Sequence, residues 1–249
     1  MNPLDPTSEP VEFTPIPRPQ PPTPRVPFFD YADLFFFLGV CIPCLFIAQL
    51  LVRVVAPTPK SVQALLAQSV WYFLAFGSLG ALFRIRYHRP FWRSLGWRPI
   101  AFSGAVGALL AGPLLALSVG LLGSALRTPE INLPFEQMLG SRGTIVLLGT
   151  LVVILGPASE ELAFRGLLMP LLIRSIGATA GVVVTGIIFG VVHGPEYQWS
   201  WQYMLLISLV GCAFGWAKYK TQSTMTSAFM HATFNLTQFA AFLVQSRSL

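Results

Sequence analysis

Seven long apolar stretches, separated by short segments rich in charge, proline or glycine, constrain this chain more than any other feature. A bilayer core of about 30 Å requires roughly 20 apolar residues for one helical crossing, and most of the stretches reach that length. Hydrophobic residues make up 54% of the chain and charged residues only 10%, which is too apolar for a soluble domain. We therefore predict an all-α, polytopic transmembrane helical bundle with about seven membrane spans. The stretches cover residues 34–55, 62–83, 101–124, 144–174, 177–193, 201–217 and 222–244.

The segment before the first apolar stretch has a different composition. Residues 1–27 hold ten of the 21 prolines and predict an extended, disordered tail, which acts either as a solvated tether or as a docking motif. The start is acidic and proline-rich, whereas a secretory signal begins with a basic region and an apolar run. We therefore do not interpret these residues as a signal peptide.

The basic residues between the spans predict the orientation of the chain. With seven crossings, ten of the 16 Lys and Arg fall on the side of the N-terminus and five on the other, while Arg165 lies at membrane depth. Cytoplasmic loops carry the excess of basic residues, so we expect a cytoplasmic N-terminus in a bacterial-type plasma membrane. Because the basic residues do not form one patch with interleaved aromatics, we expect no nucleic acid partner.

The three cysteines, Cys41, Cys44 and Cys212, all lie in apolar stretches. No Cys/His framework surrounds them, so packing is a better interpretation than metal binding or a redox pair.

Charged side chains inside an apolar stretch are the first candidates for function. An ionisable group at membrane depth costs about 2.5 to 3.5 kcal/mol on insertion scales, yet the sequence GPASEELAFRG holds three of them. Glu161 and Arg165 are spaced i,i+4, so a structural ion pair between them needs no catalysis. Glu160 points about 100° away from Glu161 and must find a partner in another helix.

Two of the three histidines, His193 and His231, lie in apolar stretches and can meet Glu160. Gly156-Pro157 should break or kink its stretch, and Ile176-Gly177 should reverse the chain. Two antiparallel helices about that reversal return His193 to the depth of Glu160. His231 and Asn235 share a face of the last helix at a similar depth. Singly, each residue is more typical of a structural group, but together they predict one intramembrane pocket.

Three motifs in this region resemble those of the CPBP family, which comprises type II CAAX prenyl endopeptidases and bacteriocin-processing, Abi-like relatives. They are EELAFR at 160–165, FGVVH at 189–193 and HATFN at 231–235, and they correspond in order to EExxxR, FxxxH and HxxxN. The resemblance implies an intramembrane peptidase core over residues 144–249, with N-terminal transmembrane helices over 28–143 and the tail over 1–27.

The resemblance also implies a role for each motif residue. Glu160 and His193 would activate a water molecule, His231 and Asn235 would stabilise the oxyanion, and Glu161 and Arg165 would orient the first motif. The metal stays open, because the family is commonly called metallopeptidase while a metal-independent glutamate mechanism has also been proposed for it. If zinc takes part, Glu160, His193 and His231 are acceptable ligands, although the HExxH pattern of soluble zinc peptidases is absent.

Three functions therefore compete. The first is an endopeptidase that cleaves a membrane protein or peptide, lipidated or not, within the lipid bilayer. The second is a non-catalytic membrane scaffold or bacteriocin-immunity factor of the same family, in which the polar cluster holds helices together. The third is a small transporter or proton carrier, which the absence of a visible inverted repeat disfavours.

Overall fold

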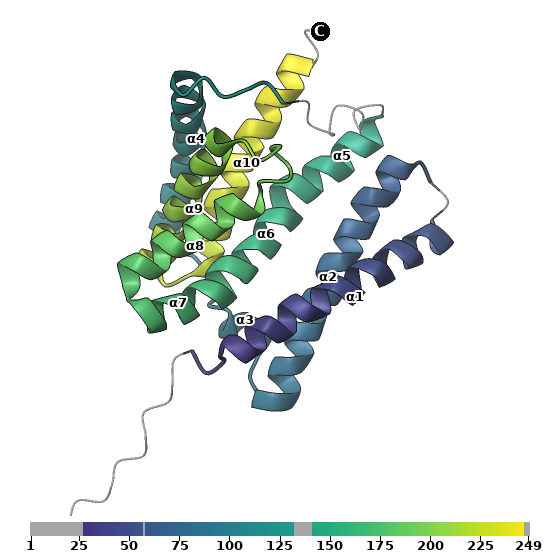
Figure 1. Ribbon diagram of the computed structural model, residues 1–249, viewed down its shortest axis with the longest axis vertical. Helices are drawn as coiled ribbons and strands as arrows, with labels where there is room; N and C mark the ends of the chain where they lie inside the picture. The colour runs from purple at the N-terminus through teal and green to yellow at the C-terminus, as the bar shows by residue number, and fades with distance from the viewer. Residues whose placement is uncertain (1–26, 57, 132–140, 247–249) are drawn as a thin grey trace, which may run out of the picture.

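The structure, a computed structural model, describes residues 27–56, 58–131 and 141–246, and the tail predicted over 1–27 lies almost wholly outside them. The described residues are helical and contain no strand. An antiparallel pair, α1 and α2, stands on one side, and α4, α8, α9 and α10 form the other (Figure 1). The helix bounds are α1 Tyr31–Val55, α2 Lys60–Tyr87, α3 Phe91–Ser94, α4 Phe102–Ala125, α5 Arg142–Thr150, α6 Gly156–Glu161, α7 Met169–Ile176, α8 Ala178–Val192, α9 Trp201–Thr221 and α10 Thr224–Ser246.

Each of the seven apolar stretches forms a helical segment, but not every segment meets the length and apolarity of a membrane span. Four do so within the described residues: Tyr31–Val55, Lys60–Tyr87, Phe102–Ala125 and Arg142–Ile176. Helix α8 is apolar but short, and α9 and α10 are long enough but less apolar. The all-helical class is thus confirmed, and four spans rather than about seven have support.

The outward faces of these helices fit a lipid environment. Large apolar side chains point outward along α1 and α4, where Phe35 is 67% exposed and Leu114 62%. In water such a continuous apolar surface would be covered by a partner or would aggregate, whereas acyl chains solvate it without cost.

The helix that carries the two glutamates continues through Gly156-Pro157 instead of breaking there. Two π-helical segments, Leu151–Leu155 and Leu162–Leu168, widen it on either side of α6. Each widened segment is followed within two residues by a proline, Pro157 or Pro170, in the first turn of the next α-helical stretch. In a regular α-helix a proline ring clashes with the carbonyl four residues earlier, and a wider turn relieves that clash. The expected break at Gly156-Pro157 is therefore wrong, and the helix instead continues with a widened segment on either side of α6.

The chain reverses at Gly177, as expected, because its φ of 85° lies in the left-handed region that favours glycine. Helix α8 then runs back along α7 and packs closely on α9. A core cluster that includes Phe37, Leu79, Phe83 and Leu167 joins the α1–α2 pair to the glutamate-bearing helix. These contacts bring α2, α6, α8 and α10 around one interior region.

Candidate functional site

The two adjacent glutamates of α6 face different surroundings. The side chain of Glu161 is fully buried, whereas that of Glu160 is 28% exposed. One residue turns an α-helix by about 100°, so neighbours in sequence cannot share a face. Glu161 therefore lies in the protein interior while Glu160 borders a cavity.

Glu161 is the centre of a buried polar network. Its carboxylate pairs with the Arg165 guanidinium at 2.9 Å and accepts hydrogen bonds from the Ser227 hydroxyl and, at 3.0 Å, from His231 Nδ1. The guanidinium also donates to the carbonyl of Gly211 at 2.7 Å and lies 4.4 Å from the centre of the Phe189 ring. The ion pair and these hydrogen bonds offset the cost of keeping both charges at depth, and among the described residues only the Arg165 Nε atom is buried without a partner. The predicted Glu161–Arg165 pair is thus present, and it ties α6, α9 and α10 together.

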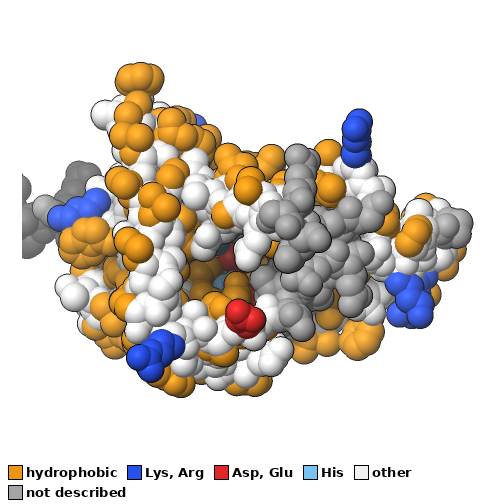
Figure 2. Space-filling view, turned by 90° about the horizontal axis from the view of Figure 1, so that it is seen from above, with side chains coloured by type: hydrophobic (Ala, Val, Ile, Leu, Met, Phe, Trp, Pro, Cys, Tyr) orange, Lys and Arg blue, Asp and Glu red, His pale blue; other side chains and the backbone are white. Residues whose placement is uncertain are grey.

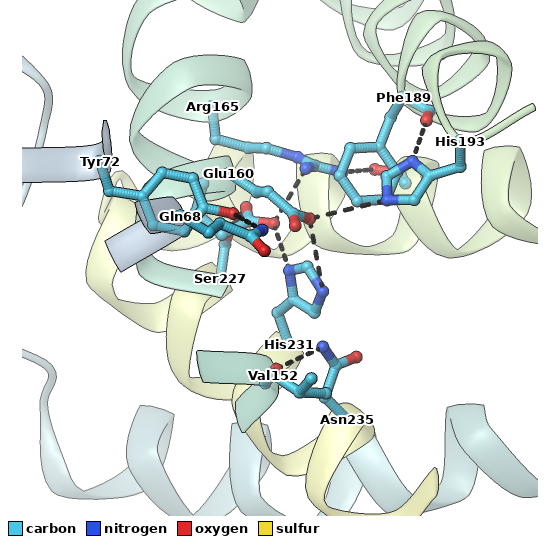
Figure 3. Close-up of polar contacts among 12 residues, drawn as sticks. Gln68, Tyr72, Val152, Glu160, Arg165, Phe189, His193, Ser227, His231 and Asn235 are labelled. Atoms are coloured by element: carbon cyan, nitrogen blue, oxygen red, sulfur yellow. Dashed lines mark hydrogen bonds and ion pairs between the residues drawn. The ribbon is translucent and has the colours of Figure 1, made fainter. Parts of the chain in front are cut away.

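Glu160 meets both predicted histidines (Figure 3). Its Oε2 atom lies 3.9 Å from Nε2 of His193 and 3.9 Å from Nε2 of His231. These separations exceed a hydrogen bond, so the three groups face one another across a small space. The expected convergence of these side chains from three helices is confirmed as geometry, while their chemical roles stay predictions.

Hydrogen bonds on the far side of each imidazole set its orientation. His193 Nδ1 lies 2.7 Å from the carbonyl oxygen of Phe189, and His231 Nδ1 lies 3.0 Å from the Glu161 carboxylate. Both partners are acceptors, so in a neutral ring the proton resides on Nδ1 and the lone pair of Nε2 faces Glu160. Phe214 stacks on the His231 ring with centroids 4.4 Å apart, which further fixes that ring.

Asn235 lies one helical turn beyond His231 but does not point at Glu160. Its side-chain amide donates to the backbone carbonyl of Val152 at 2.8 Å. That carbonyl lies in the widened π-helical segment before α6. One hydrogen of the Asn235 amide therefore takes part in this bond, and the second is available to another acceptor.

A cavity of about 640 Å³ joins these residues. Glu160, His193, His231 and Asn235 all line it. The molecule is hollowed near its centre when seen from above, with carboxylate and histidine atoms visible inside the hollow (Figure 2). Most of the remaining wall is apolar and comes from α4, α9 and α10. The cavity therefore offers polar chemistry at one place in a largely apolar enclosure.

Several residues of the site were missed in the sequence. Ser227 could have been found, because Ser227, His231 and Asn235 recur at intervals of four on one face of α10. Gly211 and Phe214 carry no signal, since one contributes a backbone carbonyl and the other an ordinary apolar ring. Gln68 and Tyr72 reach the cavity from α2, far away in sequence.

The loop after α8 contributes Glu196 and Tyr197 to the cavity wall. Burial raises the pKa of the Tyr197 hydroxyl, and the carboxylate of Glu196 raises it further, so this phenol stays protonated. Gln198 and Trp199 both adopt positive φ angles, 50° and 58°, which are uncommon for residues with side chains.

The side chains expected for a zinc ion do not fit it as they stand. A tetrahedral zinc with bonds of 2.0 to 2.1 Å holds its ligand atoms about 3.4 Å apart. The separations from Glu160 to the two imidazoles are 3.9 Å. Within the described part of the chain, no group of three or more His, Cys, Asp or Glu is arranged to hold a metal ion.

Comparison with known proteins supports the interpretation of the three motifs as those of a CAAX-type peptidase family. Residues 142–237 match the family described as type II CAAX prenyl endopeptidase Rce1-like. No curated protein and no solved structure matches the chain. The match includes all three motifs, so the resemblance to CPBP-family intramembrane proteases is confirmed over this segment.

The match and the four apolar helices together support two further statements. The protein is an integral membrane protein, and residues 142–237 are similar to CAAX-type intramembrane proteases. A family of this kind acts on membrane-associated, prenylated substrates in a lipid bilayer.

Proposed function

We propose that this chain is an intramembrane endopeptidase that hydrolyses a peptide bond of a membrane-associated protein or peptide. The observation that carries the proposal is the position of Glu160 Oε2, 3.9 Å from Nε2 of both His193 and His231 in the wall of a cavity of about 640 Å³. The acceptor atoms of Glu160 and His193, which converge in a largely apolar enclosure, suit the activation of water.

Glu160 and His193 are the proposed water-activating pair. A water molecule at about 2.8 Å from both Oε2 and Nε2 donates one hydrogen to each, which turns an oxygen lone pair toward the cavity. Because the bond to Phe189 keeps the His193 proton on Nδ1, the facing nitrogen accepts and does not compete as a donor. This geometry directs the water oxygen at a substrate carbonyl.

The proposed reaction is peptide hydrolysis in two steps. The water oxygen forms a bond to the carbonyl carbon while its proton passes to the Glu160 carboxylate, and the carbonyl oxygen takes up the negative charge. The carbon–nitrogen bond then breaks, and Glu160 returns the proton to the leaving amine. A carboxylic acid and an amine are released, and Glu160 is again ionised.

His231 and Asn235 are proposed to stabilise the oxyanion. The free amide hydrogen of Asn235 supplies one donor, and the contact with Val152 fixes the amide for this task. His231 donates through Nε2 when its ring is protonated, and the hydrogen bond from Nδ1 to the Glu161 carboxylate at 3.0 Å holds the ring in place. Glu161 and Arg165 thus orient His231 rather than touch the substrate.

The substrate is proposed to be a membrane-associated protein or peptide that the cavity holds along its apolar wall. Leu206, Val210, Phe234 and Phe239 are among the apolar residues of that wall. Such a surface favours a lipid chain or an apolar transmembrane segment next to the scissile bond. Both lipidated and unmodified peptides are therefore suitable test substrates.

The first test is the substitution Glu160→Gln, which keeps the shape of the side chain but removes its basicity. We expect cleavage to fall by at least about 100-fold, the usual contribution of a general base. Purified protein in lipid vesicles is assayed with a farnesylated CAAX peptide and with its unmodified twin. In cells, the membrane peptidome of the wild type is compared with that of the variant. Glu130→Gln, which removes an exposed carboxylate beyond α4, is the matched control.

The outcomes separate the competing functions. If the protein is a scaffold, the Glu160→Gln variant keeps the wild-type phenotype. If it is a transporter, the variant loses uptake, and neither the variant nor the wild type cleaves a peptide. Peptide products that appear equally with wild type and Glu160→Gln would contradict the proposal. A chelator applied to the wild type distinguishes the metal-independent reaction from a zinc-dependent one. Cleavage by the metal-independent reaction should persist with the chelator. Cleavage that depends on zinc held by Glu160, His193 and His231 should be lost and should return with added zinc.

A further inference from the structure

Helix α2 brings two polar residues to the catalytic cavity, although it lies outside the segment that matches the peptidase family. Gln68 and Tyr72 both line the cavity that Glu160, His193 and Asn235 line. They are spaced i,i+4 on a face of α2 whose neighbours, Leu65 and Ala75, are buried and apolar. Figure 3 shows Tyr72 reaching from α2 toward Glu160, with Gln68 beside it.

The Tyr72 ring is held in a fixed place by its packing. It lies against the cluster of Leu65, Leu148 and Leu151, which also contacts Val152 and Leu155. The neighbouring Trp71 ring lies 5.2 Å from it and is itself anchored, because its indole nitrogen donates to the carbonyl of Cys41 at 2.8 Å. A side chain supported in this way from α1 and α5 presents its hydroxyl without losing further conformational freedom.

Hydrogen bonding at Tyr72 leaves its proton available. Gln68 donates from Nε2 to the Tyr72 hydroxyl oxygen at 3.0 Å, so this bond uses a lone pair and not the O–H. A donor on the oxygen also makes the phenol a stronger donor in turn. Within the described residues, no acceptor takes the Tyr72 proton.

The neutral side chains next to Glu160 direct their hydrogen-bond donors to other partners. Both imidazoles direct their Nδ1 hydrogens away from the cavity, to Phe189 and Glu161. The Ser227 hydroxyl is bonded to Glu161, and Asn235 has committed one amide hydrogen to Val152. The reaction proposed above places a negative charge on the substrate oxygen, and a preorganised donor there is worth about 100- to 1000-fold in kcat.

We infer that Tyr72 is a further catalytic residue, which donates its O–H to the substrate oxyanion together with Asn235, while Gln68 positions its hydroxyl. This inference rests on the proposed function. It also makes α2 a necessary part of the active site.

The substitution Tyr72→Phe tests the inference, because it removes the hydroxyl and keeps the ring that packs. We expect kcat to fall by about 100-fold with KM little changed, since the oxyanion exists only after binding. A peptide phosphinate, whose tetrahedral anion resembles the intermediate, should lose affinity by a similar factor. Tyr31→Phe is the matched control. Tyr31 lies at the start of α1, and its hydroxyl forms a hydrogen bond with Ser175, away from the cavity.

A second variant keeps the test decisive if Tyr72→Phe folds poorly, which the melting temperature reports. Gln68→Leu leaves the phenol in place but removes its positioning bond, and we expect a smaller loss in kcat, about tenfold. If Tyr72→Phe keeps the wild-type kcat and phosphinate affinity while Glu160→Gln is inactive, the role of Tyr72 is wrong but the proposed function stands. Wild-type protein without any Glu160-dependent cleavage would overturn the proposed function, and this inference with it.

Discussion

One residue of offset along the helix places Glu160, the proposed general base, and Glu161, a member of a buried ion pair, in different surroundings. Glu161 is fully buried with its charge balanced by Arg165, while Glu160 borders the cavity and faces two imidazoles at 3.9 Å. Helical periodicity alone predicts this division, because i,i+4 spacing pairs Glu161 with Arg165 and leaves Glu160 on another face. The bonds from Ser227, Gly211 and Val152 are not predictable in the same way, since they depend on how separate helices pack.

Arg165 provides the first prediction at the scale of the residue. The substitution Arg165→Met leaves the Glu161 carboxylate buried without its cation. Breaking a buried pair in this way costs about 3 to 5 kcal/mol, so we expect the free energy of unfolding to fall by that amount. Denaturant-induced unfolding in detergent micelles, followed by tryptophan fluorescence, measures the change.

The double variant Glu161→Gln/Arg165→Met serves as the comparison. Removing both charges avoids an uncompensated ion, so most of the lost stability should return. Cleavage should stay low in the double variant, because His231 has lost the carboxylate that binds its Nδ1 and orients the ring. If the double variant were as unstable as the single one, the pairing argument would be wrong.

At the scale of the element, the position of His193 depends on how closely α8 approaches α9. Gly186 and Gly190 lie on the face of α8 that meets α9, and their lack of a Cβ permits that approach. A Cβ on Gly190 would lie 2.7 Å from the backbone nitrogen of Ser208, which is too close for real atoms. His193 follows one turn later and would move with the helix.

We therefore expect Gly190→Ala to lower the free energy of unfolding by about 1 to 3 kcal/mol, the usual cost of overpacking. It should also lower kcat, because a displaced His193 no longer faces Glu160. Gly107→Ala is the control: it introduces the same methyl group inside α4, where nothing lies within 4 Å. There the better helix propensity of alanine should leave stability equal or slightly higher. Equal stability of the two variants would contradict the role of the α8–α9 approach.

The sequence predicted the elements better than their internal geometry. Hydropathy placed all the long helical segments within a few residues but missed the short helix α3, and the reversal at Gly177 followed from turn chemistry. The π-helical segments before Pro157 and Pro170 were not predicted, because a helix can accommodate a proline by kinking, by ending or by widening. The choice depends on contacts with other helices that hydropathy does not contain. The position of Tyr72 in the cavity wall was not predicted either, because it also depends on how separate helices pack.

At the scale of the whole molecule, the cavity and the basic loops lie at opposite ends. The hollow is seen from the end where α4 and α10 finish, and the arginines that follow α2 lie at the other end (Figures 1 and 2). Positive residues favour the cytoplasmic side, where ten Lys and Arg are expected against five. Together these features predict that the cavity opens away from the cytoplasm.

Cysteine labelling in intact cells tests this orientation. In a background without Cys41, Cys44 and Cys212, an exposed position beside the cavity, Glu130→Cys, should react with a membrane-impermeant maleimide from outside. Arg89→Cys, exposed in the basic loop, should react only after the membrane is disrupted. The reverse pattern would invert the chain and place the mouth of the cavity in the cytoplasm. A peptide that enters through that mouth approaches Glu160 from one side of the membrane, so the labelling result also predicts the side on which such a substrate presents its scissile bond.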